Sequence, residues 1–244
     1  MRLTRVFVDA PLGSGSIVDL PVETGAHLAQ VLRVRSGDEL VLFNGDGRDF
    51  NGVVASVRGK HVTAEIGAAH PVDTESRIAI TLVQCLPRGE KMDLVVQKAT
   101  ELGVARIVPV ISQRSVVRLD ERQALSKQNH WQAVAVSACE QCGRARLPTI
   151  DRPVQLLSYL GQLARASHPR WVLEPQTAAG TPPRRALAAA EIAIGPEGGF
   201  VSDELEAFGL AQFSPLGLGP RVLRTETAAI AALVWLQTLF GDMS

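Results

Sequence analysis

The chain reads Ile78-Ala-Ile-Thr-Leu-Val83, a nearly continuous run of apolar residues. Such a run is typical of a strand that is buried on both faces, as in a parallel sheet covered by helices. The next apolar residues recur at spacings of three and four, which predicts a helix; they are Met92, Val95, Ala99 and Leu102. Gly103 is placed to end that helix. A buried strand followed by a helix predicts an α/β domain.

The rest of the chain repeats this alternation. Strand patterns lie at 106–111, 171–173, 191–194 and 213–216. Helical patterns lie at 120–141, 155–164 and 225–240. We therefore expect an α/β domain with a mostly parallel sheet.

The residues before Ile78 follow a different pattern. Short strands are predicted at 2–8, 17–20, 39–43, 49–57 and 61–66, with one helix at 23–34. Several short strands separated by turn residues predict a small β-barrel. Residues 67–76 lack periodicity and contain Pro71, so they are predicted to be a linker. We expect a barrel domain over 1–72 and an α/β domain over 73–244.

Composition narrows the class of protein. The 244 residues are 46% hydrophobic and 20% charged, enough for a sizeable core. No apolar run reaches the roughly 20 residues that a membrane helix needs. Three cysteines argue against a disulfide framework, and we expect a cytoplasmic protein. The formal net charge is zero, so charge alone does not indicate a nucleic-acid partner.

Two common kinds of catalytic site are disfavoured. Cys139 and Cys142 form a Cys-x-x-Cys motif, but no second cysteine or histidine pair lies nearby to complete a zinc site. The motif closes a predicted helix rather than following a strand, so two small buried thiols are the favoured interpretation. The five histidines have no metal-ligand spacing, and we expect no metal. The Gly-x-Ser-x-Gly motif of many hydrolases is absent.

Three loops that follow predicted strands are unusual. The first begins at Glu174-Pro175, the second is Gly195-Pro-Glu-Gly-Gly-Phe200, and the third is Leu216-Gly-Leu-Gly-Pro-Arg-Val-Leu-Arg224. We expect Ser202 to cap the helix that follows the second loop. Any one such loop is more often an ordinary turn, but two glycine-rich loops after consecutive strands favour a binding site. In an open α/β sheet, ligands bind beyond the carboxyl ends of the strands. The loops have neither a P-loop lysine nor a dinucleotide fingerprint, which favours a nucleotide-like cofactor without a triphosphate.

Arginines flank several of these segments. Each alone is more often a solvated surface charge. Together they could line a path for RNA from the small barrel to the three loops. They are Arg5, Arg33, Arg35, Arg88, Arg144, Arg146, Arg221 and Arg224.

Several segments together resemble the ribosomal RNA small subunit methyltransferase E family. The most specific are Gly195-Pro-Glu-Gly-Gly199 and Leu218-Gly-Pro-Arg-Val-Leu-Arg-Thr-Glu-Thr-Ala228. The others occur in the family's order: His27 with Val31-Leu-Arg33, Arg88-Gly-Glu-Lys-Met92, Gln97-Lys98, Glu101-Leu-Gly103 and Ala138-Cys-Glu-Gln-Cys-Gly-Arg144. The resemblance spans essentially the whole chain. Residues 174–184 match weakly, which leaves ligand roles after Glu174 unassigned.

The resemblance implies a PUA-like N-terminal barrel, a SPOUT domain with a deep trefoil knot, and a homodimer. It implies an enzyme that uses S-adenosylmethionine to methylate N3 of a decoding-centre uridine of 16S rRNA in the 30S subunit (position 1498 in standard rRNA numbering). The implied cofactor residues are Leu173, Glu174, Gly195, Pro196, Glu197, Gly198, Gly199, Leu216, Gly217, Leu218, Gly219, Val222, Leu223, Arg224, Thr225 and Thr227.

The chemistry of this reaction suggests roles for particular residues. We expect Glu197 to act as an organiser or general base, although a carboxylate that only ties down its own loop is an equal alternative. Arg224 and Arg88 are expected to stabilise the uracil anion. RNA contacts are expected from Arg5, Arg33, Arg88, Arg144 and Arg221. Two other functions remain open, a SPOUT ribose 2′-O-methyltransferase and a non-catalytic protein that binds rRNA during ribosome assembly.

Overall fold

The computed structural model describes residues 3–175, 177 and 186–243. The chain forms two compact units. The first contains Met1–Glu75 together with Val136–Leu147, and the second contains Ser76–Ala135 together with Pro148–Ser244. The end of one long helix, α3 (Glu121–Cys142), therefore belongs to the first unit. The expected division at residues 72 and 73 stays a prediction.

The first unit is a five-stranded sheet with one short helical segment. Its elements are β1 (Thr4–Phe7), β2 (Ile17–Asp19), α1 (Val22–His27), a π-helical turn (Leu28–Leu32), β3 (Glu39–Phe43), β4 (Arg48–Arg58) and β5 (His61–Pro71). The strand order is β1-β3-β4-β5-β2, and β1 pairs with β3 in parallel while the other pairs are antiparallel. Alternate residues of these strands, such as Val6, Leu42 and Val54, face a common core.

Two predictions for this unit need correction. The proposed linker begins too early, because residues 67–71 continue β5, and residues 69–71 pair with the start of β4. Most side chains of 67–71 are exposed, so the apolar alternation that marks the earlier part of β5 is missing there. The predicted helix 23–34 is also too long. The helical segment ends at Leu32, and Arg33 has a left-handed backbone with φ of 55°.

The second unit is built on a sheet in which every pair of neighbouring strands is parallel. Its strands are β6 (Ala79–Cys85), β7 (Arg106–Ile111), β8 (Thr149–Ile150), β9 (Val154–Gln155), β10 (Arg170–Leu173), β11 (Ala189–Ile194) and β12 (Phe213–Leu216). The order is β12-β10-β11-β6-β7-β8, with β9 also paired to β7. The two-residue strands β8 and β9 were not predicted, because two residues carry no periodicity.

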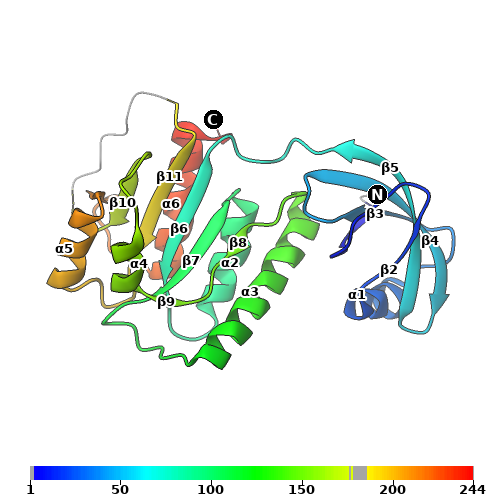
Figure 1. Ribbon diagram of the computed structural model, residues 1–244, viewed down its shortest axis with the longest axis horizontal. Coiled ribbons are helices and arrows are strands. Elements are labelled where there is room, and N and C mark those ends of the chain that lie inside the picture. The colour runs from blue at the N-terminus through cyan, green and yellow to red at the C-terminus, as the bar shows by residue number, and fades with distance from the viewer. Residues whose placement is uncertain (1–2, 176, 178–185, 244) are drawn as a thin grey trace. The chain divides into compact units, whose positions relative to one another are not determined.

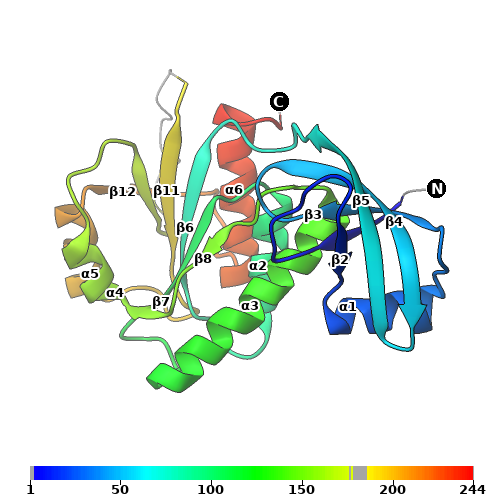
Figure 2. The ribbon, with the colours of Figure 1, turned by 45° about the vertical axis from the view of Figure 1, so that its right-hand side comes forward.

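Helices cover both faces of this sheet (Figures 1 and 2). They are α2 (Lys91–Glu101), α3, α4 (Leu156–Gln162), α5 (Ser202–Leu210) and α6 (Thr225–Phe240). Apolar residues of α2, α6 and the first part of α3 share one core with the sheet. Residues of α4 and α5 form the core on the other face, where Phe208 packs edge-on against Phe213. Most of β6 is buried, although Ala79 is exposed and Thr81 half-buried, which explains the nearly continuous apolar run at 78–83.

The parallel arrangement places the site. Because β10, β11 and β12 all point the same way, the loops that follow them lie at one edge of the sheet. The strands β6 and β7 end at the same edge. Among the described residues, no helix is long and apolar enough to cross a membrane.

Candidate active site

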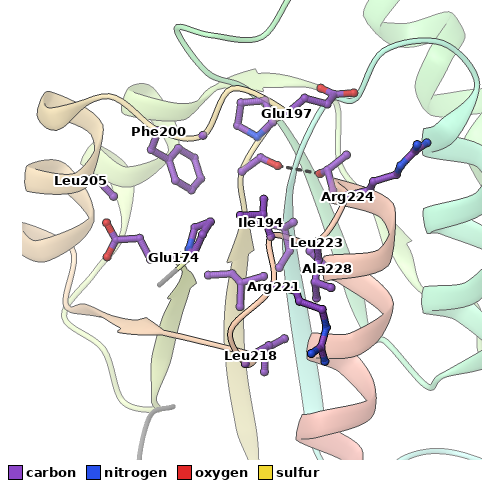
Figure 3. A pocket seen from close by; sticks show the side chains of 18 residues that line it. Glu174, Ile194, Glu197, Phe200, Leu205, Leu218, Arg221, Leu223, Arg224 and Ala228 are labelled. Atoms are coloured by element: carbon purple, nitrogen blue, oxygen red, sulfur yellow. Dashed lines mark hydrogen bonds between the residues drawn. The ribbon is translucent and has the colours of Figure 1, made fainter. Parts of the chain in front are cut away.

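A pocket of about 430 Å³ opens at this edge, between the loops that follow β10, β11 and β12. Figure 3 shows Ile194 at the centre of the pocket wall, with Glu174 and Phe200 on one side. Arg221 and Arg224 lie on the opposite side, next to α6 (Figure 3). Aliphatic side chains, glycines and prolines make up most of the lining, and its charged residues are Glu174, Glu197, Arg221 and Arg224.

The pocket contains most of the residues that were expected to bind the cofactor. Those that line it are Leu173, Glu174, Gly195, Pro196, Glu197, Gly199, Leu218, Gly219, Val222, Leu223, Arg224 and Thr225. Four expected residues do not line it: Gly198, Leu216, Gly217 and Thr227. Leu216 and Gly217 are buried, whereas Gly198 and Thr227 are exposed. The weakly matching segment 174–184 falls mostly outside the described residues.

Sequence reasoning missed five other lining residues: Pro175, Ile194, Phe200, Leu205 and Ala228. Ile194 directly precedes the second loop and Phe200 is its last residue, so their position next to the glycines was an available signal. Leu205 and Ala228 come from α5 and α6, and only the packing of these helices brings them to the pocket.

A chain of hydrogen bonds joins three segments beneath the pocket. The Thr225 hydroxyl donates to the Gly195 carbonyl at 2.7 Å. The amide of Gln84, a fully buried residue at the end of β6, donates to the same hydroxyl at 2.9 Å. The start of α6 is therefore tied to the second loop and to β6, which fixes one wall of the pocket.

The second loop is also held from the side of β7. Arg114 donates from Nη1 to the Gly198 carbonyl at 2.7 Å. The buried carboxylate of Glu204 accepts hydrogen bonds from the backbone N–H groups of Gln113 at 2.8 Å and Val201 at 3.0 Å. The predicted cap at Ser202 is therefore wrong. Ser202 is the first helical residue of α5, and Glu204 satisfies the N–H of the preceding Val201.

Glu197 stands at the rim of the pocket with three groups that favour its ionised form. Its Oε1 accepts a hydrogen bond from the Arg88 backbone N–H at 3.2 Å and lies 3.6 Å from the Lys91 ammonium. Burial raises the pKa of Glu197, but the hydrogen bonds from its own N–H and from Arg88, with the Lys91 charge, outweigh burial and leave the pKa below its ordinary value. A carboxylate with a low pKa is a weak base.

Arg88, Arg221 and Arg224, three of the six arginines expected near the reaction or the RNA, are exposed. Arg88 follows β6, and its backbone, not its guanidinium, contacts Glu197. Arg224 is the N-cap residue of α6, and Arg221 lies three residues earlier in the third loop. Both side chains point out of the pocket on the side of α6 (Figure 3). Exposed guanidiniums around a pocket can meet an anionic partner that arrives from solvent.

Arg5 and Arg144, two of the expected RNA contacts, have buried side chains that form ion pairs. Arg5 pairs with Asp49 and also donates to the Arg144 carbonyl at 3.0 Å, and its side chain is only 7% exposed. Arg144 pairs with Glu75 at 2.7 Å with 6% of its side chain exposed. All four residues belong to the first unit, so these guanidiniums hold that unit together. The Arg33 side chain is exposed, as an RNA contact requires.

The described residues contain no cluster of three or more potential metal ligands. Cys139 is fully buried, and its thiol donates to the Arg146 carbonyl at 3.6 Å. The neighbouring Cys142 thiol and burial raise the pKa of Cys139 above its ordinary value. A thiol that resists ionisation is a poor nucleophile and a poor metal ligand.

Comparison with known proteins defines the class. Residues 20–67 match the RNA methyltransferase PUA domain, and residues 74–237 match the RNA methyltransferase domain. The pocket described above lies within the second match. The fold and the site are therefore those of an RNA methyltransferase.

Individual relatives narrow the class further. The chain is 31% identical to ribosomal RNA small subunit methyltransferase E of Buchnera aphidicola subsp. Schizaphis graminum, over 100% of this chain and 99% of the relative. It is 32% identical to the enzyme of the same name from Mycobacterium bovis, over 93% and 88% of the two chains. The chain belongs to the ribosomal RNA small subunit methyltransferase E family.

Solved structures agree with this assignment. The family member from Neisseria gonorrhoeae, solved bound to S-adenosylmethionine, is 34% identical with a TM-score of 0.91 over 100% of both chains. A methyltransferase from Legionella pneumophila, solved with the same cofactor, is 37% identical with a TM-score of 0.90 over 99% of this chain and 100% of that one. The predicted fold class, a PUA-like domain followed by a SPOUT-type parallel sheet, is confirmed.

Proposed function

We propose that this protein transfers a methyl group from S-adenosylmethionine to N3 of one decoding-centre uridine of 16S rRNA in the 30S subunit. The observation that carries the proposal is the pocket at the carboxyl edge of β10, β11 and β12, built by the two loops most specific to the family. The cofactor found in the two solved relatives supports the same use of this pocket.

The pocket fits the cofactor. Its volume of about 430 Å³ is in the range of small-molecule sites. Leu173, Ile194 and Leu218 offer apolar walls to an adenine ring, and the Glu174 carboxylate offers an acceptor to ribose hydroxyls. At Gly195 an added Cβ would come within 3.2 Å of the Phe200 ring, so a side chain there would crowd the wall. When bound, the cofactor supplies an electrophilic methyl group on a sulfonium.

The protein must make N3 of uracil nucleophilic. The N3 lone pair becomes available only as the imide proton leaves, and negative charge then spreads over O2 and O4. Guanidiniums near these oxygens stabilise that charge. Arg224 lines the pocket, and Arg88 is an exposed residue whose backbone N–H contacts Glu197 at the rim. The target nitrogen must face the methyl group in line, so the base is flipped out of its stack.

Glu197 acts as an organiser in this proposal. Its lowered pKa makes it a weak proton acceptor, while its contacts to Arg88 and Lys91 order the rim. Its negative charge also favours a guanidinium or sulfonium nearby. The proton of N3 then passes to solvent or to the RNA.

Arg33, Arg88 and Arg221 are the proposed RNA contacts. Replacing Arg33 by Ala is expected to weaken rRNA binding and to reduce the slope of log affinity against log salt by about one, because one phosphate contact is lost. Filter binding at several salt concentrations measures both quantities. Arg58→Ala removes another exposed arginine of the same unit and is expected to change neither. An unchanged slope for Arg33→Ala would remove Arg33 from the RNA surface.

A preformed particle is the better substrate for a protein of zero net charge, because phosphate contacts alone give it modest affinity. A ribosomal substrate places the enzyme in the cytoplasm, and the family likeness favours a homodimer. A ribose 2′-O-methyltransferase would use the same cofactor with a hydroxyl nucleophile. Nucleoside analysis of the methylated RNA separates the two, since 3-methyluridine supports our proposal and 2′-O-methyluridine contradicts it.

A further inference from the structure

Lys91 is a cation at a place where helix electrostatics disfavour one. It is the first residue of α2, and the N-terminal end of a helix carries partial positive charge. Its ammonium lies 3.6 Å from Glu197 Oε1 and 3.4 Å from Glu226 Oε2. The positive charge of Lys91 is therefore balanced by two carboxylates from other segments and not by a carboxylate of α2.

One carboxylate lies in a glycine-rich loop of the pocket and the other in the helix that follows the next such loop. Glu197 lies within the second loop, and Glu226 lies in the first turn of α6, directly after the third loop. Glu226 Oε2 is buried and accepts no hydrogen bond from the described part of the chain. Lys91 is therefore its charge partner, and without Lys91 a nearly buried carboxylate would lack a counter-charge.

We propose that Lys91 is a positioning residue that fastens both cofactor loops to the start of α2 and so fixes the rim where the methyl acceptor arrives. The inference rests on the proposed function. The same three regions carry Arg88, Glu197 and Arg224, the residues proposed to act on the uracil. A displacement of about 1 Å in such groups can slow a reaction about 100-fold. Leu173 and Ile194, two of the apolar residues proposed to hold the cofactor, belong to β10 and β11, outside the segments with which Lys91 forms ion pairs. Loss of Lys91 should therefore affect turnover more than cofactor binding.

The chain offers a matched control on the same helix. Lys98 is 37% exposed against 34% for Lys91, and it pairs with Glu101 at 2.8 Å within α2. Lys98→Met thus removes a similar ion pair that reaches no loop. Lys91→Arg keeps the charge and is the conservative rescue variant.

Amide hydrogen exchange of the free enzyme tests the fastening without any reaction. Lys91→Met is expected to speed exchange in both 195–199 and 221–228, whereas Glu197→Gln affects mainly the first segment and Glu226→Gln mainly the second. Lys98→Met is expected to leave both unchanged. Equal exchange in wild type and Lys91→Met would overturn the proposal. This measurement decides the role of Lys91 even if the wild-type protein fails to methylate rRNA, a result that would contradict only the proposed function.

A comparison of the turnover number with the affinity for S-adenosylmethionine distinguishes a positioning lysine from one that only stabilises the fold. Lys91→Met is expected to lower the turnover number about tenfold or more while the dissociation constant for S-adenosylmethionine changes less than about threefold. Lys91→Arg is expected to restore most of the activity. Equal losses of turnover and cofactor affinity in Lys91→Met, or no rescue by Arg, would overturn the positioning role.

Discussion

Glu197→Gln is expected to lower the turnover number about 100-fold and to change the dissociation constant for S-adenosylmethionine less than about threefold. In the wild-type protein the Arg88 N–H donates to Glu197 Oε1 at 3.2 Å, and a glutamine oxygen can still accept this hydrogen bond. The substitution does remove the negative charge that faces Lys91. Single-turnover kinetics and calorimetry measure the two quantities. Glu206→Gln removes an exposed carboxylate of α5 outside the pocket and serves as the control. Equal losses of turnover and affinity would contradict a role for Glu197 at the reacting end of the pocket.

The lowered pKa of Glu197 also sets the pH range over which its ionised carboxylate stabilises the folded state. A carboxyl group whose pKa falls on folding stabilises the folded state above its unfolded pKa, and this stabilisation is lost as the pH falls through the folded pKa. Glu197 is therefore ionised throughout the neutral range. A titration seen near neutral pH in the turnover profile belongs to another group.

Arg170→Met is expected to lower the free energy of unfolding by about 3–5 kcal/mol, because it leaves a buried carboxylate without its partner. Arg170 Nε donates to Glu191 Oε2 at 3.0 Å, and the two side chains are 6% and 4% exposed. The Tyr159 hydroxyl donates to the other Glu191 oxygen, and burial raises the pKa of Tyr159, so it remains a donor. Urea denaturation measures the effect.

Arg106→Met provides the matched comparison. Arg106 also lies on a strand of this sheet and pairs with Asp151 at 2.5 Å, but 46% of its side chain is exposed. Its loss should cost less than about 1 kcal/mol, because water screens an exposed pair. Similar losses for the two variants would show that burial of the Glu191 network does not contribute the expected stability.

Much of the fold was accessible from local sequence. The apolar run at 78–83 and the helical spacing from Met92 to Leu102 reflect burial of particular faces, and burial repeats with the period of each element. The extension of β5 through 67–71 was missed because its side chains face solvent and leave no such pattern. The implied knot stays a prediction, since threading of the chain has no local signature and knots are very rare.

The position of the site was predictable from the sequence, but the contacts of its charged residues were not. Glycine-rich loops after parallel strands indicated the pocket, because strand direction alone brings such loops together. The partners of charged residues were not predictable. Arg5 and Arg144 looked like RNA contacts, yet each finds a carboxylate far away in sequence. The contacts of Lys91, Arg114 and Glu204 were not predicted, because they join segments that meet only in the folded chain.

The most direct test of the account is methyl transfer from labelled S-adenosylmethionine to 30S subunits that lack the modification, with naked 16S rRNA in parallel. Reverse transcription then maps the product, since a methyl group on N3 blocks Watson–Crick pairing. We predict one protein-dependent stop at a single decoding-centre uridine, strongest with 30S subunits. Binding of the cofactor without transfer to either RNA would contradict the proposed substrate.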